Sequence, residues 1–230
     1  MDLEKDFGVF STTAALAKMT RSCLDDGVRE GRYLRIHRNV YRVASFQKSY
    51  HQRLAGAVVA CGKDAVVSHQ SAAQLYGWLQ TKALHISIPK SRRVARSKME
   101  IHRTTHCRSV EFEGLVVTSK EQTLVDLAAV LPPRQLIEVF KKATGNEIDL
   151  ARRVWQIIEQ TGLQGRKGWK LLRRLVNAAL SRHRGLRNVL NDNFYPKDGK
   201  ARLDAMTTFR KKRRQMLRER EKEERGEHAS

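Results

Sequence analysis

Three polar residues raise the question of hydrolytic chemistry. Ser71, His69 and Asp126 are the residue types of a nucleophile, a general base and the acid that orients it. A nucleophilic serine usually sits on a strained turn between glycines, whereas Ser71 lies inside the alanine-rich string SHQSAAQL at 68–75. We therefore interpret these side chains as capping and buried hydrogen-bonding groups, and we predict no catalytic residues.

A second group has the residue types of a metal site. His102, His106 and Cys107 offer imidazole and thiolate ligands of the kind that zinc binds. Their spacing requires a helix, but the surrounding pattern indicates strand and loop, and no fourth ligand is evident. Cys23, Cys61 and Cys107 are far apart and form no C-x-x-C pair. We therefore predict no metal, no cofactor and no disulfide framework, which fits a reducing cytoplasm.

Cations give the strongest chemical signal. The 230 residues include 45 Lys and Arg against 24 Asp and Glu, a formal net charge of +21. Such a charge indicates a polyanionic partner, and a ribosome-associated or merely basic surface is the alternative. The most informative spacing is in 20–29, where Arg21, Asp25 and Arg29 repeat at i, i+4 and i+8 and would share one helix face.

These positions suit a helix that reads DNA bases. In a helix-turn-helix the second helix enters the major groove, and its first residues meet base edges. We predict that four residues read bases: Arg21, Ser22, Asp25 and Arg29. Asp25 would accept from a cytosine amino group or orient a neighbouring arginine. The predicted contacts to the DNA backbone and from the wing are Thr12, Thr20, Arg32, Arg35, His37, Arg38 and Arg42.

The elements that position these residues form a predicted N-terminal domain, residues 1–44. Ser11 or Thr12 begins one short helix, and Thr20 begins a second. Three side chains of the second helix should face inward: Cys23, Leu24 and Val28.

Glycines and an asparagine set the remaining boundaries of this domain. Gly27 inside the second helix costs on the order of 1 kcal/mol relative to alanine, and Gly31 suits the helix end. Alternating residues at 34–43 predict two strands, with Asn39 turning the chain in the left-handed region. The pattern is that of a winged helix-turn-helix, and a small helical cap with a solvated hairpin is the alternative.

Residues 45–180 predict a mixed α/β core, so the fold class is α+β. Expected helices are 45–66, 68–77, 119–131, 133–143, 149–161 and 168–181, and expected strands are 84–88, 99–103 and a hairpin at 110–117. Ser68 and a capping box of Ser119 with Gln122 should begin two of these helices.

A basic loop lies between the strands at 84–88 and 99–103, which we predict to form a hairpin. The loop carries five cations and no acid: Lys90, Arg92, Arg93, Arg96 and Lys98. We predict a second, sequence-independent contact to DNA phosphates here. The alternative is a solvated loop whose charge protects a sheet edge.

Three groups of motifs resemble the AbiEi-type antitoxins of type IV toxin–antitoxin systems. They are Gly8-Val9-Phe10-Ser11 with Gly31, Leu34-Arg35 and Arg38-Asn39-Val40-Tyr41; S-H-x-S-A-A-x-L-x-G at 68–77; and G-L-x-V-T-S-x-x-x-T-L-V-D-L-A at 114–128. Asn39 stands where those proteins usually have glycine. The resemblance spans 7–176 and implies a transcriptional repressor, an antitoxin that silences its own operon, with a nucleotidyltransferase-like toxin as an indirect partner.

The C-terminal region departs from one branch of that family. Many such chains continue into a restriction-endonuclease-like domain, whose metal site needs an Asp and a Glu-x-Lys triplet. This chain has no such triplet, so a nuclease remnant is the least favoured alternative. Residues 181–230 instead predict a linker and a basic helical tail that includes Arg210, Lys211, Lys212, Arg213 and Arg214.

Two further expectations concern partners and location. A stand-alone repressor of a phage or other mobile element, reading an asymmetric site with both domains, would use the same residues without any toxin. The charged start MDLEKDF has no signal-peptide pattern, and no run approaches the roughly 18 apolar residues of a membrane helix. We therefore expect a cytoplasmic protein whose main partner is double-stranded DNA. The sequence leaves the oligomeric state open, and a monomer is compatible with it.

Overall fold

The computed structural model describes residues 7–94, 98–105, 107–145, 148–161 and 167–182. Within them the fold is mixed α+β, with a three-stranded and a five-stranded sheet. The chain forms two units, Met1–Asn177 and Ala178–Ser230. The first unit includes all of the predicted domain 1–44 and nearly all of the predicted core 45–180. The predicted linker after residue 182 and the tail cations at 210–214 lie outside the described residues.

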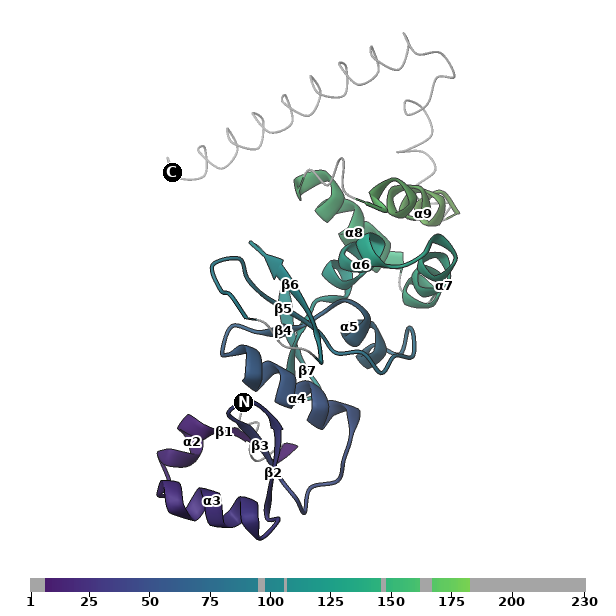
Figure 1. Ribbon diagram of the computed structural model, residues 1–230. Coiled ribbons are helices and arrows are strands. Elements are labelled where there is room, and N and C mark those ends of the chain that lie inside the picture. The colour runs from purple at the N-terminus through teal and green to yellow at the C-terminus, as the bar shows by residue number, and fades with distance from the viewer. Residues whose placement is uncertain (1–6, 95–97, 106, 146–147, 162–166, 183–230) are drawn as a thin grey trace, which may run out of the picture. The chain divides into compact units, whose positions relative to one another are not determined.

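The N-terminal part consists of two short helices and the three-stranded sheet (Figure 1). The order of this sheet is β1-β3-β2, and both pairings are antiparallel. The elements, in chain order, are β1 (Val9–Ser11), α2 (Thr12–Leu16), α3 (Arg21–Arg29), β2 (Tyr33–His37) and β3 (Val40–Val43).

Local hydrogen bonds begin these helices where the sequence predicted. Ser11 Oγ accepts from the backbone N–H of Ala14 at 3.1 Å, and Thr20 Oγ1 accepts from that of Cys23 at 3.3 Å. Asn39 has φ 61, so the wing turns in the left-handed region as expected. The caps and the turn are therefore confirmed.

The expected inner face of α3 is partly wrong. Leu24 is fully buried, but Cys23 and Val28 are exposed, and Gly27 is buried in their place. The Tyr33 ring packs against the helix at Gly27, where a Cβ would lie 2.5 Å from ring carbons. The face of α3 that meets the sheet therefore runs through Leu24 and Gly27.

Helix α4 (Tyr50–Cys61) lies between the two sheets (Figure 1). It is shorter than the predicted 45–66, because Ser49 Oγ accepts from the Gln52 N–H at 3.0 Å and Gly62 ends the helix with φ 102. Gln52 Nε2 also donates to the carbonyl of Phe7 at 3.0 Å. Val9 and Val40 share one buried cluster with Leu54, which joins the N-terminal part to the rest of the unit. These contacts explain why the unit continues past residue 44.

The five-stranded sheet has the order β6-β5-β4-β8-β7. Its strands are β4 (Val66–Val67), β5 (His85–Pro89), β6 (Glu100–Thr104), β7 (Ser109–Phe112) and β8 (Leu115–Thr118). Strands β7 and β8 form the expected antiparallel hairpin. Strands β5 and β6 are parallel, with His85 opposite Glu100 and Pro89 opposite Thr104, so the predicted hairpin is wrong there. Ten connecting residues can span over 30 Å, enough to run back along a five-residue strand of about 17 Å.

Five helices complete the described part of the chain. They are α5 (His69–Leu75), α6 (Lys120–Val130), α7 (Pro133–Thr144), α8 (Ile148–Thr161) and α9 (Trp169–Arg182). Helix α6 packs against α5, α7 and α8. Gly77, with φ 74, follows the end of α5 as predicted. No helix among the described residues is long and apolar enough to cross a membrane.

Candidate nucleic-acid interface

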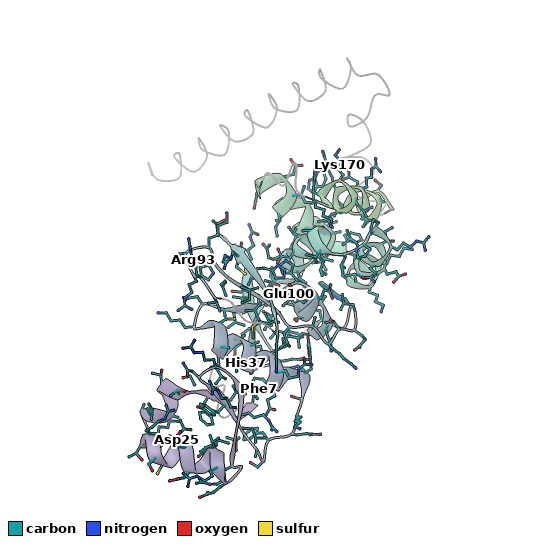
Figure 2. The ribbon with its side chains drawn as sticks, viewed as in Figure 1. Phe7, Asp25, His37, Arg93, Glu100 and Lys170 are labelled. Carbon is teal, nitrogen blue, oxygen red and sulfur yellow. The ribbon has the colours of Figure 1, made fainter. Side chains whose placement is uncertain are left out.

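The four predicted base-reading residues lie on exposed positions of α3. Arg21, Ser22, Asp25 and Arg29 are all solvent-exposed along this nine-residue helix. Figure 2 labels Asp25 among them. The structure therefore brings the predicted set together on one element, away from the side that packs on the sheet.

Each arginine of this face has a carboxylate one turn away. Arg21 Nε lies 3.2 Å from Asp25 Oδ2, and Arg29 Nη2 lies 2.9 Å from Asp26 Oδ1. Of the two roles that the sequence left open for Asp25, this contact matches the orienting one. Exposed ion pairs of this kind are worth roughly 0.2–1 kcal/mol, so a base or a phosphate can replace the carboxylate at little cost. The face is also nearly neutral, since acids balance its cations.

An aromatic cluster fixes α3 on the sheet. Phe10 meets the Tyr33 ring edge-on, with centroids 5.2 Å apart, and stacks on Tyr41 at 5.8 Å. Leu24 is buried in the same cluster. Because the aromatic residues come from all three strands of the sheet, the exposed face of α3 keeps a defined direction relative to the wing.

The wing, formed by β2, β3 and their turn, presents exposed cations. Arg35 and Arg38 are exposed, and His37 is half-buried. Arg35 Nε donates to the carbonyl of His37 at 3.4 Å, at a break in the β2–β3 register. Arg32, at the start of the wing, binds Glu30 at 2.6 Å, and this hydrogen bond raises the pKa of its guanidinium above the ordinary value. The predicted wing contacts from Arg35 and Arg38 are thus sterically open to a partner.

Two of the residues that were predicted to contact the DNA backbone are not exposed on the surface. Arg42 is only 6% exposed, and its Nη1 donates to the carbonyls of Phe46 at 3.1 Å and Val43 at 3.4 Å. The Thr12 hydroxyl is buried and has no hydrogen-bond partner among the described residues. Thr20 is exposed, but its hydroxyl caps α3. Arg42 is therefore a buried residue rather than a surface contact, and the Thr12 hydroxyl is buried although the residue itself is half-buried.

In the second basic segment, residues 90–98, some of the cations are exposed and one is bound by the fold. Lys90, Arg93 and Lys98 are exposed, and Arg93 is labelled in Figure 2. Arg92 instead donates through Nη1 to the carbonyl of Cys61 at 3.1 Å, at the end of α4. A cation at a helix C-terminus is stabilised by the helix dipole, which gives Arg92 a structural role. Arg96 lies outside the described residues.

Sequence reasoning missed Arg103, which is exposed on the edge strand β6. Its Nε donates to the carbonyl of Arg92 at 3.3 Å, so it lies beside the basic segment. The alternating pattern of residues 99–103 predicts on which face of the strand Arg103 lies. It does not predict which other segment packs beside that face. Its position became visible only with the parallel pairing of β5 and β6.

The serine and histidine considered for hydrolysis have separate partners. Ser71 Oγ accepts from Tyr50 OH at 2.9 Å and from the His85 N–H at 2.8 Å, and it donates to the carbonyl of Ala83 at 3.1 Å. His69 Nδ1 instead lies 3.0 Å from Ser68 Oγ. That contact also corrects Ser68, which stands at the N-cap of α5 without capping it.

Asp126, the acid considered for hydrolysis, and the residues considered for a metal site also have other partners or positions. Asp126 accepts from Gln122 Nε2 at 2.8 Å, and Gln122 therefore does not close the predicted capping box with its side chain. Ser119 Oγ still accepts from the Gln122 N–H, at 3.4 Å. In the part of the chain that the structure describes, which omits His106, no three His, Cys, Asp or Glu side chains are placed to hold a metal ion.

Because comparison with known proteins finds no match, a proposal about function has to rest on the geometry of the structure. No family model matches this chain, and no curated protein matches it. The likeness to AbiEi-type antitoxins therefore rests on the motifs alone. That geometry is an exposed helix face, whose cations are balanced by acids, beside a cationic wing.

Proposed function

We propose that this chain is a sequence-specific repressor that binds double-stranded DNA through α3 and the wing. The observation that carries the proposal is the division of α3 into two sides. Leu24 and Gly27 hold one side against the sheet, and Arg21, Ser22, Asp25 and Arg29 are exposed on the remaining surface. A helix about 10–12 Å across fits the major groove, which is about 12 Å wide.

In this proposal α3 supplies discrimination between sequences. Arg21 and Ser22 occupy its first turn, the part that meets base edges in helix-turn-helix proteins. An arginine that reaches guanine through two hydrogen bonds contributes about 1–3 kcal/mol of discrimination against a wrong base. Asp25 holds Arg21 in one direction before binding and rejects a misplaced phosphate.

The wing and the second basic segment supply most of the affinity. Arg35 and Arg38 are exposed cations that lack the local acid balance of α3, and Lys90, Arg93 and Lys98 add to them. Phosphate contacts of this type are independent of sequence and weaken as salt concentration rises. The net charge of +21 has the sign that such binding requires.

Repression follows by occlusion of an operator upstream of the chain's own gene. The same residues serve an autoregulating antitoxin with a nucleotidyltransferase-like toxin or a stand-alone repressor of a phage or mobile element. An adjacent toxin reading frame distinguishes these two versions. We favour the first because the motifs at 68–77 and 114–128 resemble AbiEi-type antitoxins.

The test is a footprint on the gene's own upstream region, followed by mobility-shift titrations of variants. Arg21→Ala should relax sequence choice and leave binding to unrelated duplex unchanged. Arg93→Ala should weaken binding to all sequences and reduce the slope of log affinity against log salt by about one. Lys142→Ala, an exposed cation of α7, is the matched control and should change neither. Unchanged binding for both Arg21→Ala and Arg93→Ala would show that the interface is wrong.

A further inference from the structure

A polar cavity of about 360 Å³ lies beside the five-stranded sheet. Strand β5 is buried on both faces, and its residues alternate between them. Ile86 and Ile88 enter the core that contains Leu54 of α4, whereas Ser87 lines the cavity. The cavity is therefore on the side of the sheet that faces away from α4. Its other walls come from β6, α6 and the start of α9.

One wall is a group of histidines held in place by hydrogen bonds. The rings of His69 and His102 stack with centroids 3.5 Å apart and planes at 14°. His102 Nε2 lies 3.0 Å from His85 Nδ1. His69 has φ 50, a conformation that is rare and costly for a residue with a side chain, and it is only 7% exposed. The surrounding structure thus keeps the His69 imidazole at the cavity wall.

Two serines lie beside one nitrogen of the His69 ring. Ser87 Oγ donates to Ser68 Oγ at 2.8 Å, so the Ser68 hydroxyl hydrogen is left to donate to His69 Nδ1, 3.0 Å away. In the tautomer in which Ser68 donates to Nδ1, His69 Nε2 carries the hydrogen, and no hydrogen bond joins Nε2 to another described residue. Because His69 lines the cavity, this N–H can donate to an acceptor bound there.

Two cations also line the cavity. Lys167 and Trp169 line it at the start of α9, where backbone N–H groups and the helix dipole favour an anion. Arg103 of β6 lines it as well, and Asp126 of α6 contributes the one carboxylate among the described lining residues. Burial lowers the pKa of His69 to about 3 and that of His102 to about 4, so both imidazoles are uncharged near neutral pH. Two cations and one carboxylate leave the described lining with a single positive charge.

We propose that this cavity binds a small planar anion, a nitrogen heterocycle that carries a phosphate or carboxylate group. The acidic group lies at Lys167 and the start of α9, and a ring nitrogen accepts from His69 Nε2–H. Asp126 accepts from an amino group where the ring carries one, as adenine does. Stacked imidazoles and an indole line the same space, and aromatic walls favour a flat ring. A volume of about 360 Å³ suits a small metabolite rather than a polymer, because ligand sites span about 300–1,000 Å³. The inference does not depend on DNA binding.

The experiment is a titration of the ¹⁵N-labelled full chain, followed by its backbone and imidazole ¹H–¹⁵N correlations. Adenosine 5′-monophosphate and nicotinate are the two probes, one a phosphate and the other a carboxylate. Adenosine and nicotinamide lack the acid, and inorganic phosphate and acetate lack the ring. At least one probe should shift the His69 and His102 imidazole signals, and its neutral counterpart should bind about tenfold more weakly, equivalent to about 1.4 kcal/mol. The probe that binds identifies the acidic group.

Two lysines of the same region provide the decisive variants. Lys167→Ala should weaken binding of the active probe by about tenfold, or about 1.4 kcal/mol, because it removes the cation at the acidic group. Lys170→Ala is the control: Lys170, labelled in Figure 2, is also exposed but does not line the cavity. If neither probe shifts the imidazole signals at millimolar concentration, or if both variants bind like the wild type, the proposal is wrong. Binding is measured without DNA, so this failure leaves the proposed repressor function untouched.

Discussion

The ring of Tyr33 occupies the space beside Gly27 in which any other residue would place its Cβ. Such a Cβ would lie 2.5 Å from both Cδ2 and Cε2 of the ring. Phe10 supports the ring from another side through an edge-on contact. The glycine that looked unfavourable for α3 is thus the position that lets the helix approach β2 closely.

Gly27→Ala should lower the free energy of unfolding by about 1–3 kcal/mol, as overpacking does in a dense core. This loss should exceed the roughly 1 kcal/mol that alanine gains in helix propensity. Urea unfolding followed by circular dichroism measures the change. In a double-mutant cycle, Gly27→Ala should cost less in a Tyr33→Leu background, because the ring is then absent. A stabilising Gly27→Ala would show that Tyr33 does not pack as described.

Asp25→Asn should increase affinity for unrelated duplex and reduce the preference for the operator. The substitution removes a carboxylate that lies 3.2 Å from Arg21 and that repels phosphates on the same helix face. Fluorescence anisotropy with operator and scrambled duplexes, at two salt concentrations, measures both effects. Glu111→Gln, an exposed acid of β7, changes net charge equally and serves as the control. Weaker binding of the Asp25→Asn variant to scrambled duplex would contradict the assigned role.

Two arginines of the wing should separate folding from DNA binding. Arg42→Ala removes hydrogen bonds from a buried guanidinium to two carbonyls, and should cost about 2 kcal/mol of stability. Arg38→Ala alters an exposed side chain beside the turn, so it should leave the melting temperature unchanged and weaken DNA binding. Thermal unfolding and mobility shift are measured on both variants. An Arg42→Ala variant with normal stability would place Arg42 at the surface after all.

Stability should fall as the pH drops from about 6.5 to 4. Burial, reinforced by neighbouring imidazoles, lowers the pKa of His69 to about 3 and that of His102 to about 4, whereas the unfolded side chains titrate near the ordinary 6.5. Between these values the unfolded chain binds protons that the folded chain does not, so acid favours unfolding and the full stability is present above pH 6.5. The loss should reach at most about 2 kcal/mol per histidine at pH 5.

Urea unfolding at a series of pH values measures this dependence. His102→Gln should flatten it, because glutamine does not titrate and the His69 imidazole loses a neighbouring group that can become charged. An acid limb as steep as that of the wild type would show that His102 is not the group responsible.

The sequence determined the features that depend on near neighbours. Ser11 and Thr20 begin their helices because each side chain accepts from an N–H three residues later, and Asn39 turns the wing because its backbone tolerates positive φ. The helices after residue 119 follow from apolar spacing in the same way. For the candidate interface, the period of a helix was sufficient to group Arg21 and Asp25.

Only the tertiary structure decided which basic side chains are bound by backbone carbonyls of the fold. Arg42 and Arg92 have the composition of phosphate contacts, but carbonyls outside their own strand or loop, those of Phe46 and Cys61, bind them in the fold. The pairing of β5 with β6 was equally open, because alternation is the same in parallel and antiparallel strands.

The cavity is another feature that only the tertiary structure decided. His69, His85 and His102 come from a helix and two strands, and no local pattern predicts that their rings will meet. Local residue types set caps, turns and helical periods, because those depend on bonds within one turn. Burial and partnership depend on which distant elements pack together, and that is a property of the whole chain.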